Sequence, residues 1–202
     1  VPLQTQRGPL GALVLQSYTE QSRYTDKDKE LLQFVSTQVA AAIERKQMYE
    51  RLEHMAQYDQ LTHLPNRQLF LDRLKTALAR ARREQTLLSL LFIDLDRFKE
   101  VNDTRGPAMG DLRVAQRLLE GVRASDTVAR LGGDEFVVLV EGGQAREHAS
   151  AAADKILAAF RQDFDLEGQR LYIQPSIGMA IYPDHGGEEH RLLGHADEAM
   201  YL

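Results

Sequence analysis

A nearly continuous apolar run, from Leu87 to Ile93, limits the possible folds of this chain more than any other segment does. A short apolar run of this kind is suited to a strand that is buried on both faces of a sheet. It is far shorter than the roughly 20 residues that a membrane-spanning helix requires. We therefore predict a core strand here and no membrane span in the chain.

Helical and strand patterns follow one another on both sides of this run. Helical spacing is predicted over about 66–84, 109–122, 145–160 and 189–201, and strands over 128–131, 136–140 and 171–181. Pro175 implies that the last strand lies at an edge or contains a bulge. From Leu87 onward the order is strand, helix, strand, strand, helix, strand, helix. This order predicts a ferredoxin-like α/β (α+β) fold with a central, mostly antiparallel sheet.

A long helix is predicted before this domain. A strand at 10–16 comes first, and the helix begins near Thr25, which is a good N-cap residue. A helix of about 30 residues would be about 45 Å long, which exceeds an ordinary core helix. Its narrow apolar stripe favours a connector, over 26–57, that pairs with a second copy of itself like a coiled coil. A surface helix packed on its own domain is the alternative.

The composition excludes several classes of protein. The chain of 202 residues has no Cys, which rules out disulfides, thiolate nucleophiles and Cys-ligated zinc. The net charge of −5 argues against general binding to nucleic acid. The N-terminus lacks the basic-then-apolar order of a signal peptide. We expect a soluble, cytoplasmic protein.

Acidic residues stand at the ends of the predicted strands. Asp94 and Asp96 follow the apolar run, and Asp134 and Glu135 lie in a predicted hairpin turn after Gly132 and Gly133. If the hairpin pairs beside the apolar strand, Asp94, Asp134 and Glu135 converge. Carboxylates of this kind suit Mg²⁺, and two such ions could activate a hydroxyl and stabilise a leaving phosphate. The alternative is an ordinary polar turn beside an ordinary strand cap.

Five ordered motifs give the chain a family resemblance. Residues 130–136, RLGGDEF, resemble the signature of the GGDEF family, the diguanylate cyclases. The other motifs are DQLTHLPNR at 59–67, DLDRFK at 94–99 with Asn102, Asp103, Gly106, Gly110 and Asp111, SIG at 176–178, and ADEAMY at 196–201. The resemblance covers about 58–202, which we take as the catalytic domain.

The resemblance implies a role for each matching position. Asp94, Asp134 and the Leu95 carbonyl would ligate two Mg²⁺ ions, with Mn²⁺ as a substitute. Glu135 would join this metal site and help to deprotonate the ribose 3′-hydroxyl of GTP. The implied substrate-binding residues are Asn102 and Asp111 at the guanine edge, Leu61 in the base pocket, and the Phe98 amide and Lys99 on the triphosphate. Gly132 and Gly133 would let the protein backbone approach the nucleotide closely.

The implied reaction joins two GTP molecules into cyclic di-GMP and releases pyrophosphate. Each domain would bind one GTP, so two domains must face each other, and the connector helix would form the homodimer. Residues 1–45 resemble the C-terminal end of a GAF sensor domain. Arg123 and Asp126 match the family's inhibitory RxxD motif, which implies feedback inhibition by the product.

The chain departs from the family pattern at three places. His63 stands where the family usually has Gly, and Pro107 stands where it usually has His. The sequence ends at Leu202, before the family's Ala-Lys-x-x-Gly-Arg segment, so we expect a truncated domain. These departures support an alternative function: a catalytically weak domain that binds GTP or cyclic di-GMP and regulates a neighbour such as an EAL phosphodiesterase.

Overall fold

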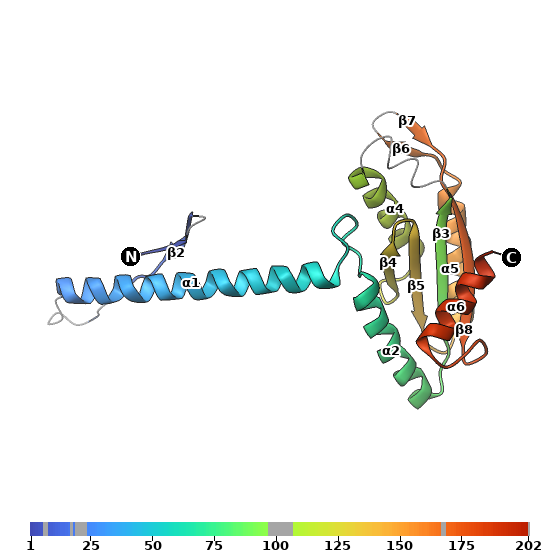
Figure 1. The fold of residues 1–202 in the computed structure, drawn as a ribbon, viewed down its shortest axis with the longest axis horizontal. Coiled ribbons are helices and arrows are strands. Elements are labelled where there is room, and N and C mark those ends of the chain that lie inside the picture. The colour runs from blue at the N-terminus through green and yellow to red at the C-terminus, as the bar shows by residue number, and fades with distance from the viewer. Residues whose placement is uncertain (6–7, 17, 19–23, 97–106, 167–168, 202) are drawn as a thin grey trace. The chain divides into compact units, whose positions relative to one another are not determined.

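A computed structural model describes residues 1–5, 8–16, 18, 24–96, 107–166 and 169–201. The chain divides into two compact units, Val1–Met55 and Ala56–Leu202. Figure 1 labels the helices and strands of both units.

The first unit opens with a small hairpin. Strands β1 (Pro2–Thr5) and β2 (Gly8–Ala12) pair in antiparallel fashion, with an irregular register between Leu3 and Gln4. The predicted strand at 10–16 is therefore wrong in its bounds, because β2 starts earlier and ends at Ala12. The short β1 partner was not predicted. Its few residues give too little alternation for a sequence pattern to detect.

Helix α1 (Asp26–Gln57) has 32 residues and starts at the predicted cap. The Thr25 backbone amide and hydroxyl both donate to Asp28 Oδ2 at 2.7 Å. These bonds hold the pKa of Asp28 below its usual value. The described part of this helix buries only Ser36 and Ala40. Seven large apolar side chains on it are between 38% and 65% exposed: Leu31, Phe34, Val35, Met48, Tyr49, Leu52 and Met55.

A four-stranded antiparallel sheet forms the centre of the second unit. Its strands are β3 (Leu88–Asp96), β4 (Thr127–Gly132), β5 (Glu135–Glu141) and β8 (Gln174–Tyr182), in the order β4-β5-β3-β8 (Figure 1). All but the first residue of the apolar run lie in β3, which has a neighbouring strand on each side. Leu88 to Ile93 are buried, as predicted for a core strand. β8 is an edge strand, as Pro175 predicted.

Helices cover both faces of this sheet. They are α2 (Arg67–Glu84), α4 (Pro107–Gly121), α5 (Ala145–Phe160) and α6 (Glu189–Met200). Alternate residues of β3 point to opposite faces. Leu91, Ile93 and Leu95 pack in one core with α4 and α5, and Leu90 and Phe92 pack in the other with α2 and α6. The mixed α/β fold with an antiparallel sheet is as predicted.

Two strands of the second unit were not predicted as separate elements. β6 (Phe164–Leu166) and β7 (Gln169–Leu171) form a hairpin between α5 and β8. The predicted strand at 171–181 thus contains the last residue of β7 and most of β8. The apolar residues Leu171, Tyr172 and Ile173 mask the break between the two strands.

Helix α6 lies very close to strand β8. A Cβ atom at Gly178 would collide with backbone atoms of Ala196 and Met200. Only glycine allows the helix and the strand to approach each other at this distance. The close approach brings the C-terminal half of α6 beside the centre of the sheet.

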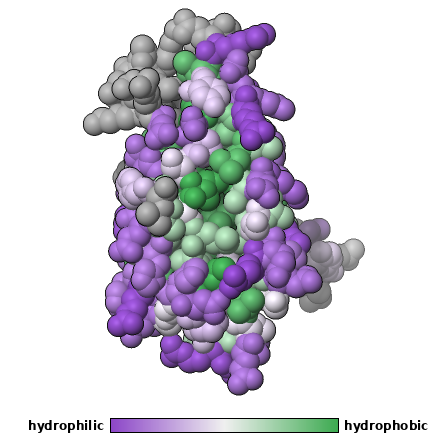
Figure 2. All heavy atoms as spheres, turned by 90° about the vertical axis from the view of Figure 1, so that its right-hand side faces the viewer, coloured by the Kyte–Doolittle hydropathy of each residue, from purple (hydrophilic) through white to green (hydrophobic). Residues whose placement is uncertain are grey.

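One face of the second unit carries an apolar band. Figure 2 shows it over the side formed by β8, α5 and α6, with hydrophilic side chains along both borders. Ile177 and Met179 of the edge strand are only partly buried, and Leu157 of α5 is exposed. Among the helices of the described ranges, none has the length and apolarity needed to cross a membrane.

Candidate active site

The turn between β4 and β5 presents the central acidic residues. β4 ends at Gly132 and β5 begins at Glu135, and the register shifts between Arg130 and Gly132. Gly133 has a φ of +50°, which side chains with a Cβ rarely adopt. The two glycines are exposed, whereas Asp134 and Glu135 are half-buried. The turn therefore places two carboxylates at the end of the sheet.

The sheet register brings a third carboxylate to the same place. Asp94 of β3 lies directly opposite Glu135 of β5. Residues that face each other in an antiparallel pair have Cβ atoms about 4.5–5.5 Å apart. On its other side Asp94 lies opposite Ser176 of β8. The pairing that the sequence analysis required of the hairpin is thus present.

Burial and electrostatic repulsion both act on Asp94. Burial and the neighbouring carboxylates Asp134, Asp96, Glu135 and Asp197 raise the pKa of Asp94 to about 6. Asp197 comes from α6, which the glycine at position 178 allows to approach the sheet. A cation bound in place of the proton would stabilise the ionised form of the Asp94 carboxylate.

Divalent cations fit this arrangement without a preformed cage. Within the ranges that the structure describes, no three Asp, Glu or His side chains stand close enough to hold a metal ion by themselves. Mg²⁺ is commonly held by one or two carboxylates together with substrate phosphates. Asp94, Asp134 and Glu135 supply hard oxygen ligands on two adjacent strands, so the donor set suits Mg²⁺ bound with a nucleotide.

An arginine network lies on the other side of the turn. Arg130 forms ion pairs with Asp59 (3.1 Å) and with Asp111. Its Nε and Nη2 atoms donate to the Gly133 carbonyl at 3.0 and 2.7 Å. The side chain is only 6% exposed and lies against the Phe136 ring. One buried guanidinium therefore links three separate segments of the chain.

Asp59 shapes the loop that enters the domain. Its Oδ1 accepts hydrogen bonds from the Leu61 and Thr62 amides and from the Thr62 hydroxyl. Burial alone would raise the pKa of Asp59, but the bonds from Thr62 and the charge of Arg130 hold it below its usual value. In the same loop His63 has a φ of +57°. This positive φ explains why a glycine would suit position 63.

The structure describes only some of the predicted nucleotide-binding residues. Asp111, near the start of α4, is fully buried and pairs with Arg130. Leu61 is half-buried in the entry loop, and Leu95 is buried in β3. Phe98, Lys99 and Asn102 lie outside the described residues.

The predicted inhibitory motif forms a tight turn before β4. The Asp126 carboxylate accepts from the Arg123 backbone amide at 3.0 Å, and the Asp126 amide donates back to the Arg123 carbonyl. The Arg123 guanidinium lies 2.6 Å from His148 Nδ1 of α5. Because arginine can only donate, His148 Nδ1 is the acceptor. The Arg123 side chain is exposed.

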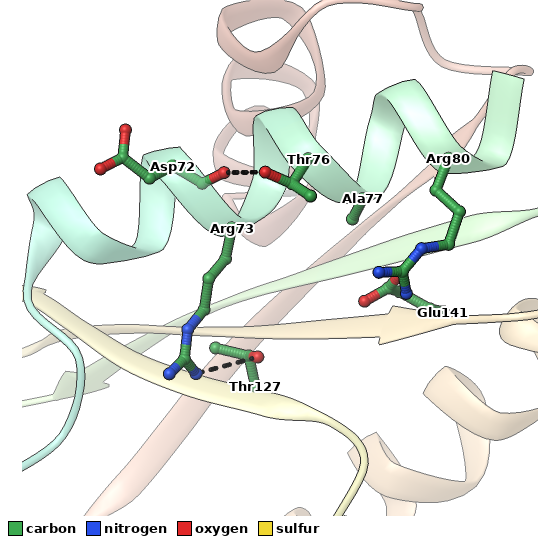
Figure 3. A pocket seen from close by; sticks show the side chains of 7 residues that line it. All are labelled: Asp72, Arg73, Thr76, Ala77, Arg80, Thr127 and Glu141. Carbon is green, nitrogen blue, oxygen red and sulfur yellow. Dashed lines mark hydrogen bonds and ion pairs between the residues drawn. The ribbon is translucent and has the colours of Figure 1, made fainter.

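Two surface pockets flank the arginines of α2. One, of about 390 Å³, is lined by Asp59, Asn66, Arg67, Gln68, Leu71, Arg130, Leu131 and Gly132. The other, of about 300 Å³, lies between α2 and the strands β4 and β5. Figure 3 shows Arg73 and Arg80 reaching across it, toward Thr127 and Glu141 respectively. Asp94, Asp134 and Glu135 do not line this second pocket.

Comparison with known proteins identifies the family of the second unit. A family model described as "Diguanylate cyclase, GGDEF domain" matches residues 56–202. The chain belongs to the GGDEF family. The GGDEF domain thus coincides with the second compact unit, Ala56–Leu202.

Curated relatives of the GGDEF domain are much longer proteins. The chain is 47% identical over 155 residues to the bifunctional diguanylate cyclase/cyclic di-GMP phosphodiesterase MucR of Pseudomonas aeruginosa. That match covers 74% of this chain and 22% of MucR. The chain therefore spans about a fifth of that relative.

Solved GGDEF structures have the same fold. The GGDEF domain of TpbB from Pseudomonas aeruginosa aligns with a TM-score of 0.66 and 44% identity, covering 71% of this chain and 86% of that one. The coiled coil and GGDEF domain of DgcB from Caulobacter crescentus, in complex with c-di-GMP, aligns with a TM-score of 0.71 and 27% identity. That alignment covers 85% of this chain and 93% of the DgcB chain.

Three residues at the GGDEF site received no role in the sequence analysis. Arg130 organises the turn, Asp197 adds to the acidic cluster, and Arg67 contacts Glu135. Arg130, Arg67 and Asp197 all stand inside quoted motifs, but motif membership does not say which residue each side chain meets. The contacts span 68 and 71 positions of sequence for Arg67 and Arg130, which local patterns do not encode.

Proposed function

We propose that this GGDEF domain is a diguanylate cyclase that condenses two GTP molecules into cyclic di-GMP. The observation that carries the proposal is the pairing of Asp94 with Glu135 beside the Gly132-Gly133 turn, with a raised pKa at Asp94. The names of MucR and TpbB, which both include diguanylate cyclase, support it.

The proposed reaction uses one proton acceptor and a set of residues that bind the substrate. Glu135 accepts the proton of the 3′-hydroxyl of one GTP, and that oxygen attacks the α-phosphorus of the other. The bond to the β-phosphate breaks and pyrophosphate leaves; a second, identical step closes the ring. Lys99 and the Phe98 amide would hold the triphosphate, Asn102 and Asp111 would bind the guanine edge, and Leu61 would line the base pocket. Because Asp111 is buried and paired with Arg130, its role requires the carboxylate to turn toward the nucleotide.

Two Mg²⁺ ions complete the proposed site, and members of this family generally use divalent metal ions. Asp94, Asp134, Glu135 and the Leu95 carbonyl would hold them. The metal ions would lower the pKa of the attacking hydroxyl and stabilise charge on the phosphates. Mn²⁺ would substitute, because it prefers the same oxygen ligands.

The first unit would serve assembly and regulation. We assign 1–45 to the end of a GAF-like sensor domain, 26–57 to a connector, and 58–202 to the catalytic domain. The exposed apolar side chains of α1 would pair with those of a second copy. Such pairing would bring two catalytic domains, each with one GTP, face to face.

Product inhibition is proposed at Arg123 and Asp126. The exposed guanidinium of Arg123 suits phosphate or the guanine edge of cyclic di-GMP, and Asp126 suits guanine N–H groups. The DgcB structure contains bound c-di-GMP, which is consistent with a product site in this family.

A regulatory binding domain is the second candidate. It would bind GTP or cyclic di-GMP without turnover and control a neighbouring phosphodiesterase. The observation that favours it is the similarity to MucR, whose name includes both activities and of which this chain spans 22%. Pro107, where the family usually has His, also favours it.

Turnover tests the proposal directly. The protein, at concentrations that permit dimers, is incubated with GTP and Mg²⁺, and cyclic di-GMP is measured by chromatography. We expect product from the parent and from Glu141→Ala, a change at the far end of the same strand, but not from Glu135→Ala. Binding of GTP without product in the parent would instead support the regulatory domain.

A further inference from the structure

Arg67 contacts both sides of the Gly132-Gly133 turn. Its Nη2 lies 3.4 Å from Glu135 Oε2, and its Nε donates to the Leu131 carbonyl at 3.4 Å. Leu131 precedes the two glycines and Glu135 follows them closely. One guanidinium therefore spans the turn that presents the acidic residues.

We propose that Arg67 is a positioning residue that orients the Glu135 carboxylate for proton abstraction. The proposal rests on the cyclase function proposed above. Arg67 engages Oε2 of Glu135, so in this proposal the proton is accepted by Oε1. The role belongs to the first residue of α2, outside the GGDEF signature itself.

The base of the Arg67 side chain is held firmly. Asn66 caps α2, since its Oδ1 accepts from the Leu69 amide at 3.1 Å. The Asn66 side-chain amide donates to the Ala56 carbonyl at 2.7 Å. The Arg130 amide of β4 donates to the Pro65 carbonyl at 2.9 Å. The start of α2 is thus fixed to the strand that leads into the turn, so Arg67 acts from a rigid position.

The Arg67–Glu135 ion pair is exposed, so its effect on turnover can be distinguished from its effect on stability. The side chains of Arg67 and Glu135 are 57% and 41% exposed. An ion pair this exposed contributes little to folding. A small displacement of a catalytic group, in contrast, can cost about 100-fold in rate. Loss of Arg67 should therefore affect turnover much more than it affects unfolding.

The chemistry of the contact favours arginine. A guanidinium offers several donors in one plane and can reach a carbonyl and a carboxylate together. A lysine at position 67 could reach Glu135 or Leu131, but its single ammonium lacks this fixed fork. A lysine at position 67 should therefore retain part of the turnover that arginine supports, and an alanine should retain none of this contribution.

The test compares Arg67→Ala and Arg67→Lys with Arg82→Ala. Arg82 lies on the same helix and donates to the Gly187 carbonyl, away from the turn. We expect Arg67→Ala to lower kcat by about 10- to 100-fold with KM for GTP changed by less than about threefold. Arg67→Lys should recover at least threefold of this loss, and Arg82→Ala should match the parent.

A second readout does not depend on activity. Hydrogen exchange of the amides of 131–135 is measured in the metal-free, nucleotide-free protein. We expect faster exchange in Arg67→Ala than in Arg82→Ala, by about threefold or more, because the clamp across the turn is lost. If the parent makes no cyclic di-GMP but this exchange rises, the cyclase function fails and the contact to the turn stands.

Two results would overturn the positioning role. A raised KM with unchanged kcat in Arg67→Ala would assign Arg67 to substrate binding. Unchanged kcat and unchanged hydrogen exchange, in a parent that is active, would show that the contact does not orient Glu135.

Discussion

The charged groups on the two sides of the Gly132-Gly133 turn differ in how far they are balanced by partners of opposite charge. On one side Arg130 is buried, and its charge is balanced by Asp59 and Asp111. On the other side Asp94 and Glu135 are half-buried, and partial burial together with the neighbouring carboxylates raises the pKa of Asp94. One side is a satisfied ionic network, and the other accumulates like charge.

The ion pairs of Arg130 stabilise the turn, whereas the acidic residues are the groups that the turn presents for function. A buried, hydrogen-bonded ion pair costs the fold heavily when one partner is removed. Removing one charge from a cluster of like charges stabilises the folded state, unless a bound ligand compensates that charge. Substitutions on the Arg130 side should therefore unfold the domain, and substitutions on the acidic side should disable it.

The largest effect is expected from Glu135→Gln. Glutamine keeps the size of the side chain but cannot accept the proton, so cyclic di-GMP formation should fall by about 10²- to 10⁴-fold. The free energy of unfolding should stay within about 0.5 kcal/mol of the parent, as for other surface changes. Initial rates and urea unfolding measure the two quantities. A large loss of stability would remove the distinction between the two sides.

Arg130→Met should destabilise the domain by about 3–5 kcal/mol, because Asp111 loses a partner inside the protein. Urea unfolding at pH 7 measures the change. Arg73→Met, which removes an exposed arginine of α2, is the matched control and should have little effect. A loss below about 1 kcal/mol for Arg130→Met would contradict the description of a network that holds the fold.

Asp94→Asn should stabilise the metal-free domain at pH 7. The folded-state pKa of Asp94, about 6, lies above its ordinary value of 3.8. The folded state therefore binds the proton more tightly, and Asp94 reduces stability as pH rises from about 4 to 6. Asparagine removes this penalty, which we place at about 1 kcal/mol after allowing for solvent screening.

Urea unfolding in the presence of EDTA, at pH 7 and at pH 4, tests this sign. The advantage of Asp94→Asn should shrink to a small fraction at the lower pH, where Asp94 is protonated in the folded state and about half protonated in the unfolded state, whose pKa is 3.8. The same variant should bind Mg²⁺ and GTP together more weakly. An advantage that persisted undiminished at pH 4 would point to packing as its cause.

The smallest effect is expected at the entry loop. His63 has a φ of +57°, so His63→Gly should raise the free energy of unfolding by about 0.5 kcal/mol. His63→Ala retains the Cβ atom and should give no such gain. Thermal unfolding of both variants compares them directly; equal behaviour would show that the backbone at this position is not strained.

Much of the fold could be predicted from local patterns. The run from Leu87 to Ile93 identified the central strand, and helical spacing located α5 at its observed bounds, Ala145–Phe160. Asn66 correctly predicted the start of α2. The short strands β1, β6 and β7 were missed, because three or four residues give no reliable period.

The site was less accessible to sequence reasoning than the fold. The motifs gave a prediction of the site residues, and the hairpin correctly predicted that Asp94 and Glu135 could meet across strands. The roles of Arg67 and Arg130 depend on contacts between distant segments. The raised pKa of Asp94 depends partly on Asp197, whose approach follows from helix packing.

Gly178 has a mechanical consequence for the acidic cluster. Side chains between a helix and a sheet normally act as a compliant layer that can repack when one element shifts. At Gly178 that layer is absent, and the backbones of α6 and β8 meet directly. The helix and the strand should therefore move together as a rigid body. A displacement of α6 should then also shift the carboxylates at the end of the sheet.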